Sequence, residues 1–367
     1  MQHDCYFMGV KNSSKKYKIS VIVPVYNAES RLYGLINNLL HQKGAGDVEF
    51  ILIDDRSTDR SFTLLSDFYF LKNMRILQTE KNGGPAACRN VGLDHSSGEY
   101  VCFVDDDDKV GEPFGFIDGV FSNMPDLEGG FFENMFPLMG DSDIILCRRV
   151  LIDPATGKIS HCHSSIDYGQ IDCEMSTTYQ RVMYMHGMQY IAGSLFRREM
   201  IDRHNIRFIP GTEPNEDLFF GLVAAYYAKK ITISRNSVYG YYLWPSSLSR
   251  QEGKMEHFYK MLLHSNRRLP MLLSHFLLKD KKYNELCRFV HAFFHTMNRD
   301  EGDMYQQGID INIYSSYDAF PEMCTFCDHI DTVCEGSTPC PNAEEFKRFT
   351  ETAAKKYMPK GFDLYQL

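Results

Sequence analysis

The chain has 367 residues, of which 44% are hydrophobic and 24% are charged, a composition typical of folded proteins and unlike that of disordered or collagenous chains. Acidic residues outnumber basic ones by 48 to 39, which gives a net charge of −9 and disfavours binding along a nucleic-acid backbone. No apolar run approaches the roughly 20 residues that cross a bilayer, and the N-terminal segment lacks the apolar core of a signal peptide. We therefore expect a globular, cytoplasmic protein without nucleic-acid partners.

Strands and helices are predicted to alternate over the first hundred residues. Four apolar, largely β-branched or aromatic runs predict buried strands, at 19–25, 48–53, 74–78 and 100–104. The segments between them predict helices, at 30–41, from 57 to about 70, and at 84–96. Alternation on this scale is typical of a parallel sheet with right-handed crossovers.

The pattern is less regular in the second part of the chain. It predicts a weak helix at 114–122, a strand at 144–152, a turn at 153–157, a helix at 215–229, and short strands at 231–234 and 238–243. From residue 251 onward the spacing of apolar residues predicts helices. We therefore divide the chain into a polar leader at 1–17, a catalytic domain at 18–250 and a mainly helical extension at 251–367.

Polar residues follow each of the four predicted parallel strands. They are Tyr26 and Asn27, Asp54 and Asp55, the run Asn82–Pro85, and the run Asp105–Asp108. Ligands of open α/β sheets bind beyond the carboxyl ends of the strands, so these residues are expected to lie around one site.

The run Asp105–Asp108 places four adjacent carboxylates at the end of one strand. A solvated acidic loop is the ordinary interpretation of such a run. Because this run follows a buried strand and is predicted to lie beside Asp54 and Asp55, we favour a site for a hard divalent cation such as Mg²⁺ or Mn²⁺.

Two further motifs admit a functional and a structural interpretation. Gly83 and Gly84 precede a predicted helix whose N-terminus could attract an anion, or they form only a turn. Glu216 and Asp217 open another helix, where one carboxylate could be a general base or both could complement the helix dipole. The chain contains neither GxGxxG nor GxxxxGK[ST]. It therefore lacks the fingerprints of dinucleotide dehydrogenases and of P-loop nucleotidases.

Together these motifs resemble, in order, the signature of family 2 inverting glycosyltransferases of the bacterial cell-surface polysaccharide type. The motifs are Val21–Asn27, Asp54–Asp59, Asn82–Asn90, Phe103–Asp108 and Glu216–Asp217. The resemblance covers about residues 18–250. It implies a GT-A fold, a Rossmann-like mixed sheet flanked by helices that binds nucleotide-diphosphate sugars.

The resemblance also implies roles for individual residues. Those expected around the nucleotide are Pro24, Tyr26, Asn27, Asp54, Asp55, Gly84, Arg89, Asp105 and Asp106. Asp107 and Asp108 would bind the divalent cation, and Asp217 would be the catalytic base. Arg56 departs from the family pattern, because many members carry glycine there, and this puts the shape of that turn in doubt.

The expected activity is metal-assisted transfer of a sugar from a nucleotide-diphosphate donor to a hydroxyl of a glycan or lipid-linked glycan. The resemblance implies a UDP-sugar donor, because UDP is the nucleotide that the family commonly uses. Two alternatives stay open: a degenerate nucleotide-sugar-binding scaffold and a metal-dependent nucleotidyltransferase. The helical tail has basic residues beside its apolar face, so it could lie on the inner face of a membrane, or it could pack on the catalytic domain or on another subunit. These residues are Lys254, Lys260, Arg267 and Arg268.

Cysteine and aromatic clusters carry weaker signals. Cys324, Cys327, Cys334 and Cys340 could form a structural zinc site or stay free thiols. The run His161–His163 predicts a surface strand rather than a metal site, because Cys162 would point away from the two histidines. Tyr239, Tyr241, Tyr242 and Trp244 could stack on a sugar, although sheet packing is the commoner role at this spacing.

Overall fold

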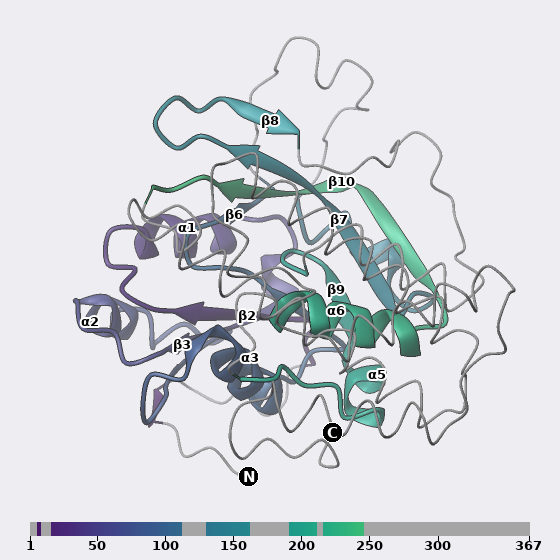
Figure 1. Ribbon diagram of the computed structural model, residues 1–367, viewed down its shortest axis with the longest axis horizontal. Helices are drawn as coiled ribbons and strands as arrows, with labels where there is room; N and C mark the ends of the chain where they lie inside the picture. Colours follow the sequence, from purple (N-terminus) through teal and green to yellow (C-terminus); the bar gives the residue numbers. More distant parts are fainter. Residues whose placement is uncertain (1–5, 9–15, 112–129, 162–190, 211–215, 246–367) are drawn as a thin grey trace, which may run out of the picture. The chain divides into compact units, whose positions relative to one another are not determined.

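The computed structural model describes residues 6–8, 16–111, 130–161, 191–210 and 216–245 (Figure 1). They belong to one compact unit of the chain. The helix predicted at 114–122, the helical tail from 251 and the cysteine cluster at 324–340 lie outside the described residues. Within the described ranges, no helix is both long and apolar enough to cross a membrane.

Ten strands of the described residues form one sheet in the order β1-β4-β3-β2-β5-β9-β7-β10-β6, and β8 pairs with β7. They are β1 (Tyr6–Met8), β2 (Ile19–Val25), β3 (Val48–Asp54), β4 (Met74–Gln78), β5 (Tyr100–Phe103), β6 (Lys109–Val110), β7 (Ile144–Ile152), β8 (Ile159–His161), β9 (Leu195–Arg197) and β10 (Ile231–Tyr242). Strands β4, β3, β2 and β5 are parallel, as predicted. Beyond β5 the sheet is mixed, because β9 is antiparallel to both β5 and β7.

Helices cover both faces of the parallel strands. The helices are α1 (Leu32–Leu40), α2 (Ser61–Ser66), α3 (Gly84–His95), α5 (Arg198–Arg203) and α6 (Glu216–Tyr227). Alternate side chains of a strand point to opposite faces, and Val21 and Val23 belong to the buried cluster that includes the apolar face of α1. Ile22 instead contacts α3, where a Cβ added to Gly92 would lie 2.3 Å from its Cγ2. The face of α3 at Gly92 therefore requires a residue without a side chain.

Three predicted segments have different bounds or pairing in the structure, and β6, β9 and α5 were not predicted. Helix α2 ends at Ser66, and turns replace the predicted helix up to residue 70. The two short strands predicted after 230 are one strand, β10, because the polar residues between them are accommodated by a shift in register between Ile233 and Val238. The predicted leader contains β1, which pairs with the edge strand β4.

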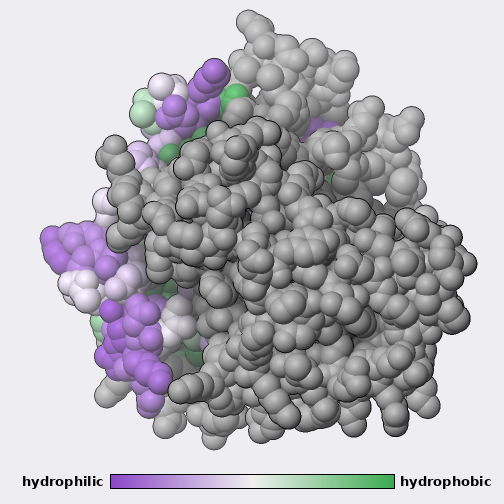
Figure 2. Space-filling view, in the orientation of Figure 1, coloured by the Kyte–Doolittle hydropathy of each residue, from purple (hydrophilic) through white to green (hydrophobic). Residues whose placement is uncertain are grey.

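The described residues at the left edge of Figure 2, the side on which α2 lies in Figure 1, are largely hydrophilic.

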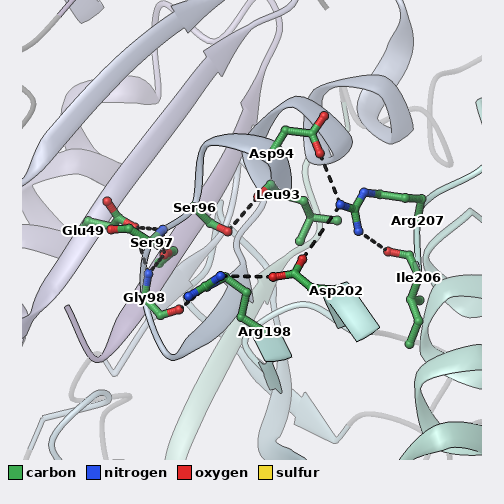
Figure 3. A network of polar contacts seen from close by, with 11 residues as sticks. Glu49, Leu93, Asp94, Ser96, Ser97, Gly98, Arg198, Asp202, Ile206 and Arg207 are labelled. Atoms are coloured by element: carbon green, nitrogen blue, oxygen red, sulfur yellow. Dashed lines mark hydrogen bonds and ion pairs between the residues drawn. The ribbon is translucent and has the colours of Figure 1, made fainter. Parts of the chain in front are cut away.

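A buried carboxylate holds the sheet at the end opposite the acidic loop. Glu49 on β3 is 1% exposed. It accepts hydrogen bonds from Ser20 Oγ at 2.5 Å, from Ser97 N at 2.5 Å and from Gly98 N at 3.1 Å (Figure 3). It also forms an ion pair with Arg75 at 3.3 Å. Glu49 thus ties β2, β3, β4 and the turn between α3 and β5 together.

Candidate active site

The loops after β2 and β3 are joined by side-chain hydrogen bonds at the carboxyl edge of the sheet. Asn27 accepts a hydrogen bond from Thr58 N at 2.8 Å, and its own N–H donates to Ser57 Oγ at 3.0 Å. Asn27 has a φ of 50°, a left-handed conformation that asparagine tolerates better than most residues. The neighbouring Tyr26 is 47% exposed. The joined loops therefore present an aromatic side chain at this edge.

Asp55 is buried and binds the start of α3. Its carboxylate accepts hydrogen bonds from Gly83 N at 2.9 Å, from Gly84 N at 2.7 Å and from Thr79 Oγ1 at 3.0 Å. A carboxylate at this place satisfies backbone N–H groups that the helix itself leaves unpaired. The anion at this helix N-terminus is therefore the side chain of Asp55.

Asp54 lies buried beside it, at the end of β3. Its Oδ2 accepts a hydrogen bond from Gln78 Nε2 at 2.9 Å. Its Oδ1 is buried and has no hydrogen-bond partner among the described residues. A buried acceptor without a donor is costly, so this oxygen is suited to receive an N–H group from a ligand.

Arg56 occupies the turn that the sequence left in doubt. Its φ of 57° lies in the left-handed region, which explains why glycine suits this position. The guanidinium stabilises the turn through hydrogen bonds to Gln78 Oε1 and Glu80 O, both at 3.0 Å.

We expect Arg56→Ala to be less stable than Arg56→Gly by about 1 kcal/mol. Both variants lose the guanidinium, but only alanine has a Cβ, which makes the left-handed conformation unfavourable. Urea unfolding of the two variants measures the difference. Equal stabilities would contradict backbone strain at this turn.

The first two carboxylates of the acidic loop after β5 have separate partners. Asp105 accepts a hydrogen bond from Arg89 Nη2 at 2.8 Å. Asp106 accepts one from Tyr26 N at 2.9 Å and lies 3.3 Å from Arg31 Nη2. Burial raises the pKa of Asp106 to about 7, although the Tyr26 N–H opposes this shift. Asp106 thus connects the acidic loop to the loop after β2.

Asp108 and Asp107 are held by the end of β10. Asp108 is 1% exposed and accepts hydrogen bonds from Tyr239 Oη at 2.7 Å and Tyr242 N at 2.8 Å. Burial, with the charges of Asp107 and Asp105, raises its pKa well above the ordinary value. Asp107 is half-buried, and its backbone carbonyl accepts a hydrogen bond from Trp244 Nε1 at 2.8 Å.

These contacts distinguish the two residues predicted to bind a metal. Both oxygens of Asp108 are buried and hydrogen-bonded to β10, whereas Asp107 is half-buried. Among the described residues, no group of three or more His, Cys, Asp or Glu side chains could hold a metal ion. Mg²⁺ is commonly held by one or two carboxylates and the phosphates of a substrate, so Asp107 fits a cation that a bound diphosphate would share.

The start of α6 approaches the same region through Arg89. Arg89 Nη1 donates to Glu216 Oε1 at 2.7 Å, and the side chains of both residues are 7% exposed. Asp217 accepts a hydrogen bond from Leu218 N at 2.7 Å. Burial, followed by the charge of Glu216, raises the pKa of Asp217 to about 7, and Arg89 opposes this shift. A carboxyl group with such a pKa is suited to accept a proton near neutral pH.

The structure adds residues that sequence reasoning did not assign to the site. Arg31, at the start of α1, pairs with Asp106 and carries no motif. Tyr239 is fully buried, so it packs in the sheet as the commoner interpretation held, yet its hydroxyl binds Asp108 and receives the Asp105 N–H at 3.2 Å. The alternation of Tyr239 with Tyr241 was the sequence signal from which its place could have been predicted. Pro24 and Gly84 lie at the same edge, at the end of β2 and the start of α3.

A parallel half-sheet with an acidic loop at its carboxyl edge, extended by a mixed half, is the arrangement of the GT-A fold. Residues 1–349 of TarS from Staphylococcus aureus, solved with UDP-GlcNAc, have the same fold, with a TM-score of 0.52, 20% sequence identity, and coverage of 80% of this chain and 92% of that chain. The predicted GT-A fold is thereby confirmed for the described residues, and the predicted helical extension lies outside them.

Residues 20–112 match the model of glycosyl transferase family 2. EpsH of Bacillus subtilis, named as a glycosyltransferase, is 24% identical over 75% of this chain and 73% of its own length. The poly(ribitol-phosphate) beta-glucosyltransferase of Bacillus spizizenii is 29% identical over 62% of this chain but only 32% of its own length. The chain is a glycosyltransferase, and its residues 20–112 are similar to glycosyl transferase family 2.

Proposed function

We propose that the chain transfers a sugar from a UDP-sugar donor to a hydroxyl of a glycan or lipid-linked glycan in cell-surface polysaccharide synthesis, with inversion at the anomeric carbon. The observation that carries this proposal is the buried pair of contacts from Arg89 to Asp105 and Glu216, because it joins the acidic loop to the residue beside Asp217. The donor class agrees with the UDP-GlcNAc bound by TarS, and the acceptor class with the name of the Bacillus spizizenii relative.

The residues at the edge of the sheet have separable roles toward the donor. Tyr26 offers an exposed ring against which a base could stack. Asp54 Oδ1 could accept an N–H from that base, because it lacks a donor among the described residues. Asp55 keeps the start of α3 in place beneath them.

Asp107 would hold a divalent cation, Mn²⁺ or Mg²⁺, which neutralises the negative charge that develops on a leaving diphosphate. Asp217 accepts the proton of the acceptor hydroxyl as its oxygen attacks the anomeric carbon. The bond from that carbon to the diphosphate breaks on the opposite side, which inverts the configuration. Glu216 and Leu218 hold Asp217 at the start of α6 through Arg89 and the backbone.

The test is release of nucleoside diphosphate from a panel of nucleotide sugars in the presence of glycan acceptors and Mn²⁺. We expect turnover with one donor, and a product of inverted anomeric configuration by NMR. A scaffold would bind the donor without turnover, and a nucleotidyltransferase would release pyrophosphate from a nucleoside triphosphate. Either result would contradict the proposal.

Trp244 gives a direct probe of the cation site. It is the chain's single tryptophan, and it binds the carbonyl of Asp107. We expect Mn²⁺ with UDP to quench its fluorescence, and Asp107→Ala to weaken the apparent Mn²⁺ affinity at least about tenfold, because the cation loses a direct carboxylate ligand. Asp141→Ala removes an exposed carboxylate elsewhere and is the control. Equal quenching in both variants would place the cation elsewhere.

A further inference from the structure

Arg89 connects the acidic loop after β5 to the start of α6. Its guanidinium lies 2.8 Å from Asp105, which follows β5, and 2.7 Å from Glu216, which opens α6. Asp217 follows directly in the sequence. One buried guanidinium thus joins two carboxylates, and its charge also acts on Asp217.

Helix α3 also contacts Phe208, whose ring in turn packs on α6. Asn90, the residue after Arg89, donates to Phe208 O at 2.8 Å and accepts from Phe208 N at 2.9 Å. The Arg89 guanidinium lies 5.4 Å from the centre of the Phe208 ring. That ring stacks on Phe220 of α6, with centroids 4.3 Å apart. Residues 89 and 90 therefore fix α6 relative to α3 through two independent sets of contacts.

We propose that Arg89 is a positioning residue, which joins Asp105 to Glu216 and thereby sets the position and the charged surroundings of the base Asp217. It need not touch the nucleotide, because both of its terminal nitrogens are directed to protein carboxylates. This inference rests on the proposed function, in which Asp217 takes the acceptor proton.

The charges around Asp217 predict the direction in which its pKa moves when a neighbouring charge is removed. Glu216 faces it from α6, Arg89 from α3 and Asp105 from the loop after β5. The negative charges of Glu216 and Asp105 raise the pKa of Asp217, and the positive charge of Arg89 lowers it. Neutralising Arg89 should therefore move this pKa upward, and neutralising Glu216 should move it downward.

The experiment compares the pH dependence of kcat/KM for Arg89→Gln, Arg89→Lys and Glu216→Gln in the full chain, with the UDP-sugar donor saturating. A carboxylate base must be deprotonated, so its ionisation sets the acidic limb of the profile. We expect Arg89→Gln to move this limb to higher pH and Glu216→Gln to move it to lower pH. Arg89→Lys retains the charge and should leave the limb near its wild-type position.

The expected loss of kcat in Arg89→Gln is about 100-fold, with donor KM changed less than about threefold, because a displaced base slows the chemical step more than binding. If Arg89→Gln fails to fold, Glu216→Gln and Arg89→Lys carry the test. Limbs that stay in place, or that move in one direction in both neutral variants, would overturn the inference.

Asp217→Asn separates this inference from the proposed function. Loss of transfer in Asp217→Asn, together with unmoved limbs in the other variants, rejects only the role of Arg89. Wild-type transfer by Asp217→Asn rejects the assignment of the base, and the role of Arg89 falls with it. Loss of transfer together with limbs displaced in opposite directions supports both.

Discussion

Replacing Asp217 by asparagine is expected to lower sugar transfer by about 10²- to 10⁴-fold, the usual contribution of a general base. The amide keeps the shape of the carboxyl group but cannot accept the acceptor proton at neutral pH. Donor binding should persist, since Asp217 has no assigned role toward the nucleotide. The measurement is kcat with saturating donor and acceptor, alongside the UDP-induced shift in Tm.

The wild-type pH profile gives an independent check of the same residue. Because burial and Glu216 raise the pKa of Asp217 to about 7, the active, deprotonated form increases as pH rises through that value. Activity of the wild type should therefore fall below about pH 7, well above the range in which an ordinary aspartate titrates. A profile that stays flat down to pH 5, or full activity in Asp217→Asn with Asp141→Asn as control, would rule out this base.

Glu49→Ala is expected to destabilise the protein by about 3–5 kcal/mol, the cost of breaking a buried ion pair from one side. Arg75 would lose its carboxylate partner, and Ser97 N and Gly98 N would lose their acceptor. The turn cannot relax easily, since a Cβ on Gly98 would lie 2.5 Å from Ser20 N and the backbone is closely packed there. Urea unfolding measures the loss.

The control is the exposed pair of Lys18 and Asp47, whose side chains are 47% and 49% exposed at a separation of 3.5 Å. Asp47→Asn should cost less than about 1 kcal/mol, as is usual for exposed pairs. If Glu49→Ala were as mild as the control, the buried network would contribute little. A double variant with Arg75→Met should lose less than the sum of its parts, because the two residues share one interaction.

The parallel half of the sheet was predictable because each of its strands is a short apolar run followed by polar residues. Strands β2, β4 and β7 begin and end at the predicted residues. Strand β9 and helix α5 have three and six residues, too short for a periodic pattern to develop. β10 could not be distinguished from two strands, because only pairing with β7 on both sides of its register shift makes it continuous.

The strand-end rule also placed the acidic residues at one edge, but it could not separate their roles. Those roles depend on partners far apart in the sequence: Asp106 with Tyr26, 80 residues away, Arg89 with Glu216, 127 away, and Asp108 with Tyr239, 131 away. Four adjacent aspartates look alike as a sequence. Only the folded chain directs Asp108 to β10 and Asp105 to Arg89.

The most direct test of the account is the Tm of the purified chain with a panel of nucleoside diphosphates and their sugars, with and without Mn²⁺. Binding to the folded state stabilises it by RT ln(1 + [L]/Kd) and so raises Tm, and no acceptor is needed. We predict a shift with UDP or a UDP sugar that requires Mn²⁺, persists in Asp217→Asn and is lost in Asp107→Ala. A shift with no nucleotide, or one that Asp107→Ala leaves intact, would contradict a metal-assisted nucleotide-sugar site at this edge of the sheet.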